Sequence, residues 1–389
     1  MKIVQIELFH VDLRKISPGH QLFLLRLLTD EGISGAGEMA MPYGVGGETL
    51  ITAAKAIGQR FVLGWEADNP ELLWQTIFRS SYWTLGHATA LYGAMSGYDI
   101  ALWDLKGQMA NRPIWWLLGG KVHSQLVLYA NHWYGNAQTP EELAEQAQKA
   151  VAQGWQGLKF DPFRQRASKT QPAIHYLDKN TARLGIAKAQ AVRKAVGEEV
   201  RLYFDLHGAL SPADAIRWGS ALAELSPEFI EEPTDTLHYT ASLLIRQALP
   251  HLPLAGGERL YLRQHFIPYL ENRIFHTLQP DVCLAGGITE TRKIAIMAEA
   301  YQTYVQLHNC ASPVCTAATV QVMAATSNVI VQEWFPFWED GRYAIVEDPL
   351  ELKANHGVLD IDRHACQPGL GIRLNMDYLN RWKIETLKY

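Results

Sequence analysis

The stretch Arg201-Leu202-Tyr203-Phe204-Asp205 decides the fold, because it is a short apolar run that ends in a carboxylate. The same pattern returns 26 residues later at Glu231 and a further 27 residues later at Glu258. It continues, at gaps of 23, 27 and 25 residues, through three more polar residues: Asp281, His308 and Glu333. A strand, a return helix and two short loops take roughly 25 residues, so this rhythm predicts a (β/α)8 barrel.

Polar residues at the carboxyl ends of barrel strands converge on one mouth, where barrel enzymes carry out their chemistry. There Asp205, Glu231 and Glu258 would repel one another unless a hard cation held them, and Mg²⁺ prefers oxygen ligands. The alternative is that these acidic residues only start loops or cap helices. Because six polar residues keep the same register, we favour the first interpretation and expect one Mg²⁺ per subunit.

The composition is that of an enzyme with a large core. The 389 residues suit one large barrel plus a smaller domain, and 48% hydrophobic with 19% charged residues is not typical of disorder. The net charge of -5 argues against a nucleic-acid surface. The four cysteines form no CxxC pair, and no signal-peptide core or membrane-spanning run is visible. We expect a cytoplasmic enzyme that acts on a small molecule, binds neither nucleic acid nor membrane, and forms a homo-oligomer.

The first part of the chain predicts a small α+β domain over residues 1–118. Residues 2–13 and 21–29 alternate like strands, and helical periodicity follows over residues 48–118. Strands followed by helices are typical of this domain class. The glycine-rich stretch 42–47 lacks the ending of a phosphate-binding loop. A lid over the substrate is therefore the better interpretation of that stretch.

From residue 119 to residue 368 the pattern changes to alternating strands and helices, which predicts the barrel itself. Thr139-Pro140-Glu141-Glu142 is expected to open one of the return helices, with Thr139 as N-cap. The expected barrel strands are 126–131, 157–161, 201–205, 228–231, 252–256, 277–281, 304–308 and 329–333. The tail 369–389 lies beyond the last strand and is expected to return to the first domain.

Two residues next to the expected metal ligands need an interpretation. Glu232 follows Glu231 directly and would point the other way in an extended strand, so Glu231 is the preferred ligand. His207 lies two residues past Asp205 and would face the same pocket. A solitary His near a strand end is usually a structural group, but its position beside a cation favours a functional role.

Asp281 and His308 close consecutive strands, so their side chains can form a hydrogen bond. A carboxylate on one imidazole nitrogen fixes the tautomer and raises the basicity of the other, which makes His308 a candidate general base. The alternative is a buried structural pair. Glu333 is expected to bind a substrate oxygen or to shift nearby titrations. Lys159 could balance an anionic substrate, or it could simply be solvated.

A cation that faces a base suggests proton abstraction from the carbon next to a carboxylate. Removing that proton places two negative charges on the carboxylate oxygens as an enediolate. A divalent ion beside those oxygens stabilises the charge.

Several motifs resemble those of the enolase superfamily, in the mandelate racemase-like group, over nearly the whole chain. They are Asp99-Ile100-Ala101-Leu102-Trp103-Asp104-Leu105-Lys106-Gly107, Phe229-Ile230-Glu231-Glu232-Pro233, Gly257-Glu258-Arg259-Leu260, Gln279-Pro280-Asp281 and Ala285-Gly286-Gly287-Ile288-Thr289-Glu290. The resemblance implies a capping domain at the N-terminus and a modified barrel behind it. It also implies that two cap loops, around residues 17–20 and 41–48, close over the substrate.

Within this group, Asp205-Leu206-His207 is similar to the Asp-x-His motif of sugar-acid dehydratases, notably those of galactonate and mannonate. That likeness implies that His207 protonates the departing hydroxyl and that His308 is the base. The chain departs from the racemases and cycloisomerases of the group, which commonly carry Lys-x-Lys, because it has Lys159-Phe160-Asp161. The missing second lysine weakens two-base racemisation and favours one-sided elimination.

The sequence therefore predicts a Mg²⁺-dependent dehydratase of an aldonate or aldarate, which yields a 2-keto-3-deoxy acid. The alternatives are a racemase or epimerase, a lactone cycloisomerase, or a catalytically silent metal-binding regulatory protein. Four residues in loops or near strand ends are candidates for substrate binding: His20, Tyr43, His132 and Trp334.

Overall fold

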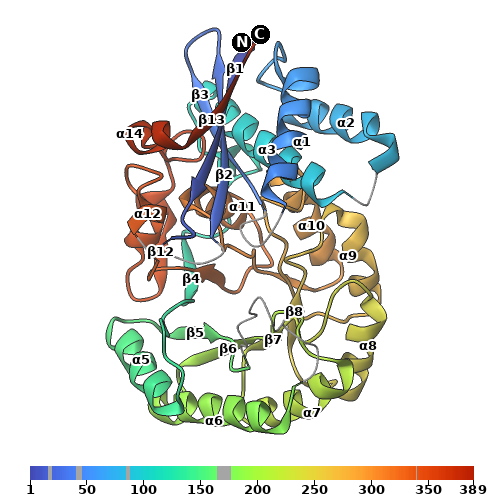
Figure 1. The fold of residues 1–389 in the computed structure, drawn as a ribbon, viewed down its shortest axis with the longest axis vertical. Coiled ribbons are helices and arrows are strands. Elements are labelled where there is room, and N and C mark those ends of the chain that lie inside the picture. Colours follow the sequence, from blue (N-terminus) through green and yellow to red (C-terminus); the bar gives the residue numbers. More distant parts are fainter. Residues whose placement is uncertain (16–19, 41–45, 85–87, 164–176, 339) are drawn as a thin grey trace.

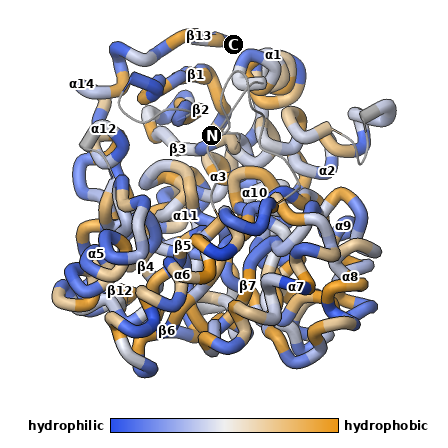
Figure 2. Tube along the Cα trace, turned by 60° about the horizontal axis from the view of Figure 1, so that its bottom comes forward, coloured by the Kyte–Doolittle hydropathy of each residue, from blue (hydrophilic) through white to orange (hydrophobic). Residues whose placement is uncertain are grey.

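The computed structural model describes residues 1–15, 20–40, 46–84, 88–163, 177–338 and 340–389. Figure 1 shows two parts, an upper region built from the first residues and the last strand, and a larger lower region in which strands and helices alternate. The short apolar and polar segments of the lower region alternate along the chain in Figure 2, as expected for strands that are covered by amphipathic helices. No helix among the described residues has the length and apolar character needed to cross a membrane.

The upper region is an antiparallel sheet in the order β13-β1-β2-β3, with helices packed on one side. Its strands are β1 (Ile3–Asp12), β2 (Gln21–Thr29), β3 (Ser34–Met39) and β13 (Lys383–Lys388). Its helices are α1 (Gly47–Ile57), α2 (Pro70–Ser80) and α3 (Thr89–Met109), with a π-helical turn at Gly58–Val62. Since β13 pairs with β1, the last strand of the chain completes the sheet that the first strand begins.

Strand β3 lies outside the strands predicted from sequence. Its sequence Ser-Gly-Ala-Gly-Glu-Met has no β-branched or aromatic residue, so it lacks the usual signal of a strand. The two glycines have a packing role instead, because a Cβ atom on Gly37 would collide with the carbonyl oxygen of Gly97 in α3. Close approach of β3 to α3 therefore explains the glycines.

The lower region is a curled parallel sheet of eight successive strands in the described residues, β4 to β11. They are β4 (Gln125–Ala130), β5 (Gly157–Phe160), β6 (Arg201–Asp205), β7 (Phe229–Glu231), β8 (Leu254–Gly256), β9 (Thr277–Leu278), β10 (Tyr304–Val305) and β11 (Gln332–Trp334). The barrel class of fold is thus confirmed. The last strand begins at Gln332 rather than at residue 329. The side chain of Gln332 contacts the segment that follows β10, with its Nε2 2.6 Å from the carbonyl oxygen of Leu307.

The return helices of the barrel are α5 (Pro140–Ala152), α6 (Lys179–Val196), α7 (Pro212–Ala223), α8 (Tyr239–Ala248), α9 (Leu262–Glu271), α10 (Gly287–Ala300) and α11 (Pro313–Ala324). The predicted capping box at Thr139 and Glu142 is confirmed. Shorter elements are α4 (Ile114–Leu117), α12 (Asp340–Tyr343), β12 (Val358–Asp360), α13 (Ile361–His364) and α14 (Met376–Leu379).

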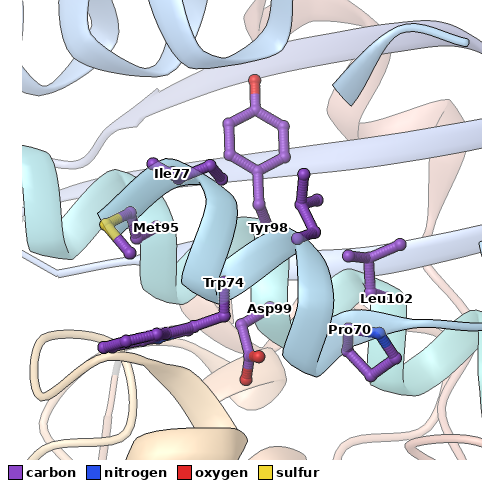
Figure 3. Close-up of a pocket in the computed structure, with 8 residues that line it drawn as sticks. Pro70, Trp74, Ile77, Met95, Tyr98, Asp99 and Leu102 are labelled. Carbon is purple, nitrogen blue, oxygen red and sulfur yellow. The ribbon is translucent and has the colours of Figure 1, made fainter. Parts of the chain in front are cut away.

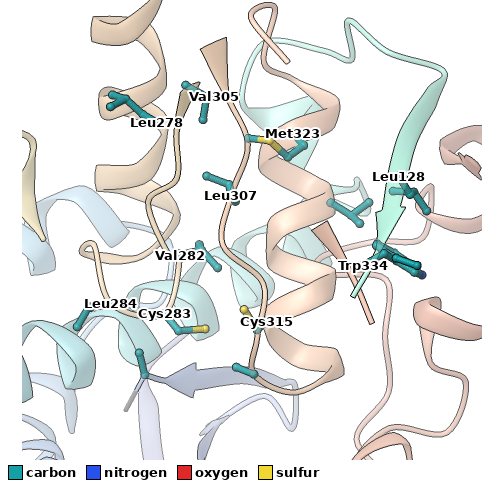
Figure 4. Close-up of a cluster of buried hydrophobic side chains, with 14 of the residues drawn as sticks. Leu128, Leu278, Val282, Cys283, Leu284, Val305, Leu307, Cys315, Met323 and Trp334 are labelled. Atoms are coloured by element: carbon teal, nitrogen blue, oxygen red, sulfur yellow. The ribbon is translucent and has the colours of Figure 1, made fainter. Parts of the chain in front are cut away.

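Two buried helices join the parts. Every residue of α11 is buried, and Figure 4 shows it packed beside β10 within a cluster of apolar side chains. From the other side, α3 contributes Asp99, whose carboxylate accepts from the backbone N–H of Thr289 at 2.9 Å. Between α2 and α3 a cavity of only about 10 Å³ remains, lined by Trp74 and Tyr98 among others (Figure 3). Since this holds at most one water, the cap is tightly packed.

Candidate active site

The structure brings together three carboxylates, one each from the ends of β6, β7 and β8. Asp205, Glu231 and Glu258 each offer an oxygen, and these oxygens lie within 4.8 Å of one another. Asp205 and Glu231 are direct neighbours in the parallel register. Glu258 lies two residues past β8, after Gly257, whose φ of +118° is open to glycine but not to most residues. The regular strand spacing therefore produces one acidic cluster.

Lys159 lies inside the barrel and contacts the acidic cluster from within. Its ammonium is 2.7 Å from Glu231, 3.4 Å from Asp205 and 2.6 Å from Glu333, and only 1% of the side chain is exposed. Burial alone would lower the pKa of Lys159, but the charges of Glu231 and Glu333 raise it well above its usual value. This placement differs from the predicted one, because the charge faces three carboxylates of the protein rather than open solvent or a substrate.

The electrostatics of Glu231 favour a bound cation. Burial and the charge of Asp205 raise the pKa of Glu231 well above its usual range, although Lys159 acts in the opposite direction. Its Oε1 atom is fully buried and has no hydrogen-bond partner among the described residues. A buried carboxylate oxygen without a partner is costly. A divalent ion shared with Asp205 and Glu258 would satisfy it.

His308 and Asp281 form the expected hydrogen-bonded pair, with 2.7 Å between Nδ1 and Oδ2. The second nitrogen, Nε2, is 3.5 Å from Glu258 and so faces the acidic cluster. Burial lowers the pKa of His308, but the charge of Glu258 and the bond with Asp281 raise it well above its usual value. With Nδ1 bonded to Asp281, Nε2 is the nitrogen that can exchange a proton at the mouth.

His207 lies on the other flank of the cluster and is half exposed. Its Nδ1 is 2.9 Å from Asp161, and its Nε2 is 3.5 Å from Asp205. Burial lowers the pKa of His207, but the charge of Asp205 and the bond with Asp161 raise it to about 10. Sequence reasoning did not assign a role to Asp161; the only signal was its place in Lys159-Phe160-Asp161, where the racemases of the resembled group commonly have a second lysine.

Glu333 is fully engaged in contacts within the protein. Its Oε1 contacts Lys159 and accepts from Asn131 at 3.0 Å, while Oε2 accepts from the backbone of Asn309 at 2.9 Å. Burial raises the pKa of Glu333, but the charges of Lys159 and His308 lower it below its usual value. The carboxylate is therefore held ionised, and it orders the loop that follows His308.

The four predicted substrate residues differ in placement. Tyr43 lies outside the described residues. His20 is nearly buried, and its Nδ1 is 2.6 Å from the guanidinium of Arg342. His132 lies in a left-handed turn after β4 and lines a separate side cavity of about 230 Å³ beside α5. Trp334 is fully buried and donates to the carbonyl oxygen of Glu351 at 3.0 Å. Its ring belongs to the core and has no surface to offer a substrate.

A second group of possible ligand atoms, Asp281, Cys283 and Cys315, lies behind the His308 pair. Both thiols are fully buried. Burial raises the pKa of Cys283 well above its usual value. The hydrogen bond with Cys283 lowers the pKa of Cys315, but burial and nearby negative charge raise it to about 11. The two cysteines are therefore neutral packing groups.

Comparison with known proteins places this geometry in a family. Residues 14–119 match the "Mandelate racemase / muconate lactonizing enzyme, N-terminal domain" model, and residues 142–378 match the "Enolase C-terminal domain-like" model. The chain belongs to the enolase superfamily. The predicted resemblance is thus confirmed. The first matched region includes β2 and β3 of the upper part of Figure 1, and the second includes strands β5 to β11 of the lower part.

Individual members of the superfamily are similar along almost the full chain. A D-galactonate dehydratase of Variovorax paradoxus is 32% identical over 96% of this chain and 92% of its own. A D-gluconate dehydratase of Thermoproteus tenax is 29% identical over 93% of this chain and 70% of its own. A solved structure of an enolase superfamily member from Salmonella Typhimurium superposes with a TM-score of 0.91, at 30% identity and full coverage of both chains.

Membership in the enolase superfamily implies a divalent metal, and the residues present fit one. Three carboxylates on adjacent strands supply oxygen ligands, and the unpartnered oxygen of Glu231 lies among them. When bound, such an ion stabilises the negative charge that develops on a substrate carboxylate.

Proposed function

We propose that this protein is a Mg²⁺-dependent acid-sugar dehydratase. It would remove the proton next to the carboxylate of an aldonate or aldarate and eliminate water to give a 2-keto-3-deoxy acid. The observation that carries the proposal is the pair of histidines on either side of one acidic cluster, each bonded to its own aspartate. His308 is held by Asp281 and His207 is held by Asp161. The named dehydratase relatives agree with this reaction class.

The two histidines would serve successive halves of one elimination. Nε2 of His308 takes the proton from C2, and its imidazolium is stabilised by Asp281. His207, whose ring is oriented by its bond with Asp161, gives a proton to the hydroxyl that leaves C3. Asp205, Glu231 and Glu258 would hold the Mg²⁺. Lys159 and Glu333 would support this arrangement from inside the barrel by fixing charge and geometry rather than by contact with the sugar.

A racemase or epimerase would need a second base on the opposite face of the substrate. The described structure has Asp161 directly after strand β5, two residues past Lys159, and Asp161 is bonded to His207. Elimination with an acid on that side is therefore the better-supported reaction. A lactone cycloisomerase or a silent metal-binding regulator remains an outcome of the test.

The test is a screen of a diastereomeric library of aldonates and aldarates for 2-keto acid formation with Mg²⁺. D-galactonate and D-gluconate come first, because the named relatives act on them. Formation of a keto acid that stops in excess chelator and resumes with Mg²⁺ would support the proposal. Inversion at C2 without water loss would instead favour the racemase, and metal binding without any C2 exchange in D2O would favour the silent protein.

The proposal extends to the domain boundaries, the cap loops, the oligomeric state and the localisation of the protein. Residues 1–118 would form the capping domain, completed by residues 369–389, and residues 119–368 would form the catalytic barrel; the pairing of β13 with β1 supports this division. The cap loops around residues 17–20 and 41–48 would close over the sugar end of the substrate; residues 17–19 and 41–45 of these loops lie outside the described residues. We further propose a cytoplasmic homo-oligomer, which sedimentation and localisation measurements would test.

A further inference from the structure

The end of strand β3 in the cap contacts both barrel loops that carry the His308–Asp281 pair. The backbone N–H of Ala40 donates to the carbonyl oxygen of Cys283 at 3.0 Å, in the loop that follows Asp281. Two residues earlier, the carboxylate of Glu38 accepts from Ser312, in the loop that follows His308. One short segment of the cap therefore reaches both halves of the pair.

Glu38 is held by four hydrogen bonds from the start of α11. Its Oε1 accepts from the backbone N–H of Ser312 at 3.0 Å. Its Oε2 accepts from the same N–H at 3.1 Å, from the Ser312 hydroxyl at 2.6 Å and from the backbone N–H of Cys315 at 2.9 Å. Only 1% of Glu38 is exposed. A carboxylate at this place satisfies free N–H groups of the first helical turn and complements the positive end of the helix.

These bonds fix the segment between the base and the helix. Ser312 is the N-cap of α11 and lies four residues after His308. The same segment is held from another side, because the guanidinium of Arg342 donates to the carbonyl oxygen of Ala311 at 2.5 Å. In the neighbouring loop, the N–H of Cys283 donates to Asp281 at 2.7 Å. Asp281 and His308 are thus placed by loops whose outer sides both rest on β3.

We propose that Glu38 is a positioning residue for the Asp281–His308 pair: it fixes the loop that aims Nε2 of His308 at the substrate. The proposal rests on the role of His308 as general base in the proposed function. A residue of the cap would then fix the position of the general base, in addition to any role of the cap in covering the substrate. Misplacement of a catalytic group by about 1 Å can cost on the order of 100-fold in rate.

Asp104 offers a matched control for this proposal. It is also a buried cap carboxylate, 3% exposed. It accepts from two backbone N–H groups, those of Ala36 and Leu370, each at 2.9 Å. It therefore anchors the same strand β3, but to the tail of the chain rather than to the loops of the base. Asp104→Asn should lower the free energy of unfolding, as Glu38→Gln does, but it should leave the position of His308 unchanged.

The experiment measures steady-state kinetics of the Mg²⁺-loaded enzyme for wild type, Glu38→Gln and Asp104→Asn at pH 8, above the pKa of about 7 to which burial raises Glu38. The amide that Glu38→Gln introduces places an N–H₂ donor against backbone donors, so the loop should loosen. We expect kcat of Glu38→Gln to fall about 10- to 100-fold with KM nearly unchanged. Asp104→Asn should keep kcat within about threefold of wild type. Equal losses of kcat in both variants would overturn the proposal, because the role of Glu38 would then be only structural.

Two further measurements need no substrate. Hydrogen exchange followed by mass spectrometry should show faster exchange of residues 309–315 in Glu38→Gln only. The rate at which diethyl pyrocarbonate modifies His308, relative to His207 in the same sample, should change in that variant only. If wild type converts no acid sugar, the proposed function fails, whereas the proposal for Glu38 fails if these two readouts stay unchanged. Should Glu38→Gln not fold, Ser312→Ala removes one of the bonds and should shift the same readouts in the same direction.

Discussion

Replacing Lys159 with Met should destabilise the metal-free protein and leave the metal-loaded protein much less affected. Met has nearly the length of Lys and no charge, so the barrel interior stays filled. What is lost is the ammonium 2.7 Å from Glu231, 2.6 Å from Glu333 and 3.4 Å from Asp205. All of these side chains are almost completely buried, so the three carboxylates would lose their shared counter-charge in a medium of low polarity.

The expected loss follows from this burial. Removing one partner of a buried ion pair typically costs about 3–5 kcal/mol, because the remaining charge is uncompensated. Proton uptake by Glu231 or Glu333 limits the cost, so the lower part of that range is the better expectation near pH 6 and the upper part near pH 8. Mg²⁺ bound by Asp205 and Glu231 has the same sign of charge as Lys159. The ion would therefore compensate part of what the substitution removes.

The assay is urea unfolding of wild type and Lys159→Met, each in EDTA and in saturating Mg²⁺. The variant should lose about 3–5 kcal/mol in EDTA and clearly less with the metal. Lys149→Met is the matched control, because Lys149 forms an exposed pair with Glu145 at 2.8 Å and should cost less than about 1 kcal/mol. A loss for Lys159→Met as small as that of the control, or equal with and without Mg²⁺, would refute the reasoning.

Three other predictions concern the site and its titration. Glu258→Gln should leave the unfolding curve in EDTA nearly unchanged and abolish both Mg²⁺ binding and turnover; full activity would remove Glu258 from the ligand set. His308→Asn should stop both the exchange of the C2 proton with D2O and dehydration. His207→Asn should keep this exchange, with retention of configuration, and produce little keto acid. A normal dehydration rate in His207→Asn would contradict the role of His207 as the acid. Burial raises the pKa of Glu38 and of Glu351 from 4.5 to about 7. Between pH 4.5 and pH 7, each of these two carboxyl groups is therefore protonated in the folded state and ionised in the unfolded chain. The free energy of unfolding in EDTA should therefore fall as pH rises from about 4.5 to 7, by about 1.4 kcal/mol per pH unit for each group. Glu351→Gln should make that fall shallower. An unchanged slope in this variant would argue against a raised pKa of Glu351.

The parts of the site that the sequence predicted are those fixed by strand periodicity. Asp205, Glu231 and Glu258 each follow a buried run, and in a parallel sheet equal spacing alone brings strand ends together. The pairing of Asp281 with His308 follows from the same rule, since each lies three residues past one of the neighbouring strands β9 and β10 and the two are in register. Local periodicity is thus sufficient where a residue's position depends only on its own strand and the next one.

The remaining parts depend on contacts that periodicity does not encode. Trp334 was expected in a loop, but the last strand begins three residues later than predicted, at Gln332, and includes it. Lys159 is inward-facing because its charge meets three carboxylates from other strands. Glu38 lies more than 270 residues from Ser312 in sequence, and its strand gives little β signal. Long-range charge and hydrogen-bond partners, rather than local pattern, decide these placements.

Asp161 connects the sequence departure on strand β5 with the direction of the reaction. A second lysine at this place would supply a base on the face opposite His308, and both faces could then exchange the C2 proton. Asp161 is instead anchored by the backbone N–H of Phe163 at 2.8 Å and bonded to His207 at 2.9 Å. An aspartate at this place thus orients the imidazole of His207 where a lysine would supply a second base, which is the arrangement that the proposed elimination needs. A site with a base on one flank and an acid on the other is suited to elimination, because each proton then moves in one direction only.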